Sequence, residues 1–122
     1  MPDTLRRHAA RGLTDTDQTP KPPWRARKEA YLAHLSEASS AVLLVSLADK
    51  IHNAGSILRD LRNEGDSVWS RFTGGRDGSL WYYRVLVDAL HARGQFTIMV
   101  GELERVVSEI ERLANSPSID QA

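Results

Sequence analysis

The sequence contains no cysteine, and it has no excess of charge of either sign. The lack of cysteine excludes disulfide bonds and thiolate metal sites. The 16 basic residues balance the 16 acidic residues, so overall charge does not indicate a nucleic-acid-binding protein. The longest apolar run is shorter than the ~18 residues of a membrane span. No apolar segment follows the N-terminal arginines, as it does in a secretory signal. We therefore expect a cytoplasmic protein that binds neither nucleic acid nor membrane.

Internal repeats and the alternating pattern of β-strands are also lacking, whereas helical periodicity is common. A chain of 122 residues with 41% hydrophobic residues is long enough and apolar enough for one packed domain. The pattern predicts an all-α fold. We expect an irregular segment over residues 1–22, a helical domain over 23–115 and a tail over 116–122.

We expect four substantial helices and one short one. The predicted helices cover about residues 24–38, 40–63, 67–72, 79–93 and 98–114. The second is the longest and is expected to be the central helix, with Gly65 as its C-terminal stop. The glycines of the turn at 73–78 could bring backbone amides to a phosphate. The lysine of a P-loop is missing, however, so an interhelix loop is favoured.

The central helix carries polar residues at the same spacing as apolar ones. The following residues recur every three or four positions: Val42, Val45, Ala48, Asp49, His52, Asn53 and Ser56. On a helix this spacing places them on one face. An unpaired charge on a buried face is costly. The sequence therefore predicts either a polar site that opens on this face or partners that hold the polar groups.

Asp49 has two interpretations. The favoured one is a structural ion pair with Lys28 or Arg25 of the preceding helix, and the other is a metal ligand. Asn53 lies one turn later, and its carboxamide can donate to and accept from a nucleotide or a metal-bound water. None of the four histidines precedes an aspartate or shares an i, i+4 pair with another, and no catalytic triad is indicated.

Two other groups leave alternatives open. Arg25, Arg27 and Lys28 lie near the start of the first predicted helix, where positive charge opposes the helix dipole. They form either a solvated face or a cluster that faces an anion. The aromatic run Trp81–Tyr83 could stack a nucleobase, although a place in the core is favoured.

The segment Leu47–Ala54, with the sequence LADKIHNA, resembles the last motif of the HD-domain metal-dependent phosphohydrolases. The resemblance is greatest to the branch that hydrolyses guanosine tetra- and pentaphosphate in the stringent response. Two further stretches are similar to that branch: Leu13–Tyr31, which contains LTD and PKPPWRARKEAY, and Leu80–Arg84. The resemblance implies the C-terminal part of an HD-domain helical bundle.

The resemblance also implies a metal and a ligand. The family binds a divalent metal, usually Mn²⁺, through a histidine, a His-Asp pair and a later aspartate. Asp49 matches that last ligand, and Asn53 and Ser56 match positions that contact the nucleotide. The implied partner is a guanosine polyphosphate, and the implied chemistry is attack of a metal-polarised water on a phosphate ester or anhydride.

The upstream part of the family pattern has no counterpart. Only thirteen residues precede Thr14, they contain no His-Asp pair, and Arg11 lies where the branch has an acidic residue. We therefore expect a truncated phosphohydrolase that is inactive alone and to which no catalytic residue is assigned. We also expect self-association through an apolar helix face left exposed. The alternative is a non-catalytic helical module that binds a nucleotide or another protein.

Overall fold

A computed structural model describes residues 23–116 of the chain. Its elements are α2 (Trp24–Glu37), α3 (Ser40–Glu64), the 3₁₀ helix η1 (Gly65–Arg71), α4 (Gly75–Arg93) and α5 (Thr97–Asn115). Over these described residues there is no strand, which confirms the predicted all-α fold. The segments 1–22 and 117–122 lie outside the described residues.

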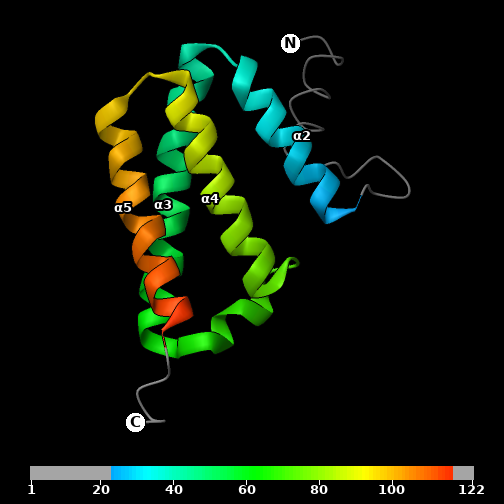
Figure 1. Cartoon of the computed structure of the whole chain (residues 1–122), viewed down its shortest axis with the longest axis vertical. Helices are drawn as coiled ribbons and strands as arrows, with labels where there is room; N and C mark the ends of the chain where they lie inside the picture. Colours follow the sequence, from blue (N-terminus) through cyan, green and yellow to red (C-terminus); the bar gives the residue numbers. More distant parts are fainter. Residues whose placement is uncertain (1–22, 117–122) are drawn as a thin grey trace, which may run out of the picture.

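The four α-helices run up and down, and η1 closes one end (Figure 1). α3 and α5 run side by side in the same direction, and α4 packs against α5. α2 lies against the other side of α4, while η1 contacts both α3 and α4. This arrangement brings the start of α2, the middle of α3 and the start of α4 around η1.

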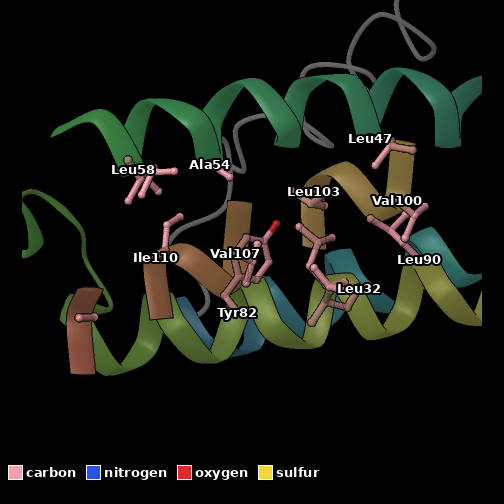
Figure 2. Close-up of a cluster of buried hydrophobic side chains, with 14 of the residues drawn as sticks. Leu32, Leu47, Ala54, Leu58, Tyr82, Leu90, Val100, Leu103, Val107 and Ile110 are labelled. Carbon is pink, nitrogen blue, oxygen red and sulfur yellow. The ribbon is translucent and has the colours of Figure 1, made fainter. Parts of the chain in front are cut away.

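The inner face of α3 forms one side of the core. Its buried residues recur at helical spacing: Leu43, Leu47, Ala54, Ile57, Leu58 and Leu61. Figure 2 shows side chains of this face pointing towards Val107 and Ile110 of α5. Burial of each leucine contributes about 1.5–3 kcal/mol relative to its exposure. This packing fixes the rotation of α3 about its axis.

The predicted stripe on α3 lies on a different face from the one that packs. Val42 is 44% exposed and Val45 is 71% exposed, and Ala48, Asp49 and His52 are exposed as well. The leucines that pack, Leu43, Leu47, Leu58 and Leu61, lie on another face of the helix. The stripe through Val42 and Val45 therefore faces away from the core, and the carboxylate of Asp49 needs no burial.

The segment Ser40–Arg71 is apolar and long enough, by length and composition alone, to cross a membrane. Core helices of soluble proteins pass the same test, and the inner face of α3 belongs to the core. This finding does not decide between membrane and solvent. The cytoplasmic location stays a prediction.

Two helix starts differ from the expected ones. α4 begins at Gly75 rather than Ser79, so most of the predicted turn at 73–78 is helical. The cap of α5 is Phe96, with φ of 53°, and Thr97 is the first helical residue rather than its cap. Ile98, the second residue of this helix, is 84% exposed. The helix begins one turn before its first buried residue, Val100, so Ile98 has no neighbouring element to pack against.

Polar side chains join the ends of the helices. Arg93 donates from Nη1 to the carbonyl of Leu35 at 2.7 Å and so satisfies a C-terminal carbonyl of α2. Gln95 donates from Nε2 to the hydroxyl of Ser40 at 3.0 Å. These bonds connect the α4–α5 loop to the junction of α2 and α3.

The ring of Trp24 lies against Gly74 and Gly78 at the start of α4, where neither residue has a side chain. A Cβ at Gly74 would lie 2.6 Å from this ring, whereas one at Gly55 would meet only Arg59 at 3.7 Å. We predict that Gly74→Ala lowers the free energy of unfolding by about 1–3 kcal/mol through overpacking. Gly55→Ala, the matched control, raises it by up to about 1 kcal/mol through helix propensity. Urea unfolding measures both, and equal stability of Gly74→Ala and the wild type would contradict this packing.

Candidate functional site

Two adjoining pockets open where α2, α3, η1 and α4 meet. The larger has a volume of about 340 Å³. Its lining residues are Trp24, Arg27, Lys28, Lys50, Asn53, Arg71, Phe72, Thr73, Ser79, Tyr82 and Tyr83. Its volume lies at the lower end of the range found for small-molecule sites. We call it the basic pocket, because four of these residues carry positive charge.

The cations of the basic pocket lie close enough to repel one another. The pKa of Lys28 falls below its usual value, first because the amine is buried and then because Lys50 and Arg27 are near. Among the described residues that line this pocket there is no carboxylate. A bound anion would reduce this repulsion, and the geometry is therefore suited to a phosphate or another multiply charged group.

Aromatic rings hold the two lysines in place. The Lys28 amine lies 4.5 Å from the centroid of the Tyr82 ring, and the Lys50 amine lies 5.0 Å from that of Tyr31. Each contact is a cation–π interaction, which partly offsets the burial of charge. Lys50 also lies 3.5 Å from a carboxylate oxygen of Asp49. The lysines are therefore oriented before any ligand binds.

The phenols of the pocket remain protonated at neutral pH. Burial, with the nearby carboxylate of Asp49 as the second cause, raises the pKa of Tyr83 to about 12. Burial and Tyr31 raise the pKa of Tyr82 further. Each hydroxyl is thus a neutral hydrogen-bond donor. Thr73 and Ser79 add two more hydroxyls to the lining.

The second pocket, which we call the mixed pocket, has a volume of about 320 Å³. It is lined by Asn53, Ser56, Ile57, Asp60, Arg71, Phe72 and Tyr83. Four of these residues also line the basic pocket: Asn53, Arg71, Phe72 and Tyr83. The mixed pocket differs in charge, because it contains the carboxylate of Asp60 and an aliphatic wall. The two pockets together offer a cationic end and a less charged, partly aromatic end.

The structure places the three predicted site residues at or beside these pockets. Asn53 lines both pockets and donates from Nδ2 to Oδ2 of Asp49 at 3.3 Å. Ser56 lines the mixed pocket and accepts from Arg59 at 3.0 Å. Asp49 lines neither pocket and is joined to them through Asn53 and Lys50. The favoured ion pair from Asp49 to Lys28 or Arg25 is wrong, because the cation beside it is Lys50 of the same helix.

A divalent metal does not fit the described residues. Within residues 23–116, no group of three or more histidine, aspartate or glutamate side chains is close enough to hold one. A catalytic metal of this kind usually has about three protein ligands. Asp49 alone does not supply such a site. We derive no catalytic step through a metal.

The three basic residues near the start of α2 lie in two different environments. Arg27 and Lys28 line the basic pocket, in agreement with the anion-facing alternative. Arg25 lies outside, with its guanidinium 3.5 Å from the centroid of the Trp81 ring and Nε 3.2 Å from Glu29. Tyr82 is 4% exposed, so the favoured core interpretation of the aromatic run is confirmed at that position.

Three charged residues of the pockets were not identified from the sequence. Lys50 lies three positions before Asn53, and this spacing on a helix could have indicated it. Arg71 and Asp60 carried no such signal, because η1 folds back towards α3 and brings them together across eleven residues. The length and direction of η1 are consequences of tertiary packing.

The chain matches no protein-family model and no curated protein sequence at a significant level. The geometry of the pockets is therefore the main basis for a functional proposal.

We predict that Mn²⁺ alone neither stabilises the chain nor supports turnover. At 1 mM Mn²⁺, ~1 °C or less of change in Tm is expected, because one exposed carboxylate binds the ion weakly. An assay of guanosine tetraphosphate with Mn²⁺ is expected to show no hydrolysis above that of Asp49→Ala. Robust turnover that Asp49→Ala abolishes would contradict this prediction. Turnover unchanged by the substitution would point to a contaminant or another site.

Proposed function

We propose that this chain binds a nucleotide that carries several phosphates, of the guanosine polyphosphate class, in the basic and mixed pockets. In this proposal the described domain is the part of a metal-dependent phosphohydrolase that binds the nucleotide, and this domain is inactive by itself. The likeness of residues 47–54 to the last HD-domain motif supports the choice of ligand class.

The single observation that carries the proposal is the crowding of cations in the basic pocket. Lys28 and Lys50 line the same space, and the pKa of Lys28 is lowered first by burial and then by the proximity of Lys50. Holding like charges together in a partly buried site opposes folding. Asp49 offsets part of the charge of Lys50 from beside the pocket, and a bound anion would reduce the remaining repulsion. A polyphosphate supplies several negative charges and many acceptor oxygens for the amines, the guanidinium of Arg71 and the phenols.

The mixed pocket supports a nucleoside beside those phosphates. Phe72 and Tyr83 offer ring faces or edges to a base. Asn53 and Ser56 offer a carboxamide and a hydroxyl for the sugar or the base edge. The nucleoside would thus occupy the less charged end while its phosphates occupy the basic pocket.

The proposal predicts that removal of one pocket lysine weakens binding strongly. Lys28→Met is expected to weaken guanosine tetraphosphate binding by about 10- to 100-fold, the value of one charged hydrogen bond. The matched control is Arg105→Met, which removes an exposed charge from α5 that lines neither pocket. Isothermal titration calorimetry measures both. Equal affinities of Lys28→Met and the wild type would exclude this pocket as the site.

Ligand fragments and pH test the same proposal. Pyrophosphate should compete with the nucleotide, whereas guanosine should bind far more weakly. The pKa of Lys28 is lowered in the free protein, so its charge is present below that pKa and is lost as pH rises through it. Affinity should therefore fall towards alkaline pH in the wild type earlier than expected for an ordinary lysine. Guanosine that binds as tightly as its tetraphosphate would contradict the assignment of the pocket to phosphates.

A second candidate function, protein interaction, is favoured by the outer face of α3. Val42, Leu44 and Val45 are 44%, 39% and 71% exposed, and Ala41 and Ala48 lie exposed beside them. Together these residues form an exposed apolar face over the first half of the helix. Such a contiguous face is typical of surfaces that contact another protein. A second copy of the chain is the simplest partner to test.

We predict that the described fold self-associates through this face. Val45→Ser is expected to raise the dimer dissociation constant by about tenfold or more, because apolar area is lost from both copies. Ile98→Ser is the control, since Ile98 is exposed on α5 and not on α3. Sedimentation velocity distinguishes the species. A wild-type chain that remains a monomer at high concentration would rule out self-association.

A further inference from the structure

The guanidinium of Arg71 lies between the two pockets and is held by carboxylates of α3. Its Nη2 lies 2.9 Å from Oδ2 of Asp60 and 3.9 Å from Oε2 of Glu64. Arg71 lines both pockets, whereas Asp60 lines only the mixed pocket. The same cation is therefore within reach of two possible partners, the carboxylates of α3 and a ligand in the basic pocket.

The present contacts of Arg71 are open to exchange. The side chains of Arg71, Asp60 and Glu64 are 49%, 38% and 46% exposed. Ion pairs exposed to this degree contribute little to stability, because water screens them. A phosphate group offers the guanidinium two parallel charged hydrogen bonds, which are stronger than one contact at the surface. A phosphate is thus able to replace Asp60 as the partner of Arg71.

We propose that Arg71 exchanges partners when a phosphorylated ligand binds. Its guanidinium then leaves Asp60 and Glu64 and pairs with the phosphates in the basic pocket. This inference rests on the proposed function of that pocket. Asp60 then limits affinity, because every ligand must compete with its carboxylate for Arg71. Ligands with several charges compete well, and ligands without phosphate do not. Arg71 is in this sense a residue that determines which ligands bind.

The exchange predicts that removing an acidic side chain from the site strengthens ligand binding. Asp60→Asn is expected to bind guanosine tetraphosphate about threefold to tenfold more tightly than the wild type, because it frees Arg71. Arg71→Gln is expected to bind at least about tenfold more weakly. Asp88→Asn is the matched control, since Asp88 is exposed on α4 and lines neither pocket.

The double variant Asp60→Asn/Arg71→Gln separates exchange from general electrostatics. If Asp60 acts through Arg71, its substitution gives no gain once Arg71 is absent. A gain that persists in the double variant would overturn the exchange and leave only long-range repulsion of the ligand by Asp60. Unchanged or weaker binding by Asp60→Asn would overturn it as well.

Isothermal titration calorimetry of the whole chain with guanosine tetraphosphate measures the wild type and all four variants, and circular dichroism melts verify that each is folded. The tests of the two proposals fail differently. Absence of binding by the wild type and by every variant would overturn the proposed function, and the exchange with it. Wild-type binding that Lys28→Met weakens and Asp60→Asn does not tighten would overturn the exchange alone.

Discussion

The packing of α3 against α5 is the constraint on which the other features depend. Because Leu43, Leu47 and Leu58 must face α5, the rotation of α3 about its axis is fixed. That rotation turns Lys50 and Asn53 towards α2 and α4, where they line the basic pocket. It also leaves Asp49 beside the pocket and Val45 in solvent. One apolar contact thus positions the polar groups of the site and exposes the apolar face of α3.

The second constraint is electrostatic, and it opposes the first. The charges of Lys28, Lys50 and Arg71 gather around one space whose described lining contains no carboxylate, and their mutual repulsion costs stability. The rings of Tyr82 and Tyr31 contact the amines of the two lysines. The carboxylate of Asp60 on α3 pairs with the guanidinium of Arg71. The site is therefore oriented in advance, and the described residues that line the basic pocket include no carboxylate, as expected of a pocket that binds a polyanion.

Much of the fold could be predicted from the sequence, because helical periodicity and the stop at Gly65 are local signals. The buried face of α3 could not, since two faces carry apolar residues and only packing against α5 decides between them. The start of α4 packs against Trp24, a contact across fifty residues that local sequence patterns do not reveal. The site was predicted in part: Asn53 and Ser56 lie in the pockets, whereas Arg71 reaches them through the tertiary path of η1.

The central claim is that the space between α2, α3 and α4 holds a phosphorylated nucleotide. An NMR titration of the isotopically labelled chain with guanosine tetraphosphate tests it most directly. The account predicts that the amide shifts that change group around Lys50, Asn53, Arg71 and Tyr83, with little change near Glu104 and Arg105, which lie in α5 on the far side of the fold from α2 (Figure 1). Changes confined to that far side, or no changes at saturating nucleotide, would contradict it.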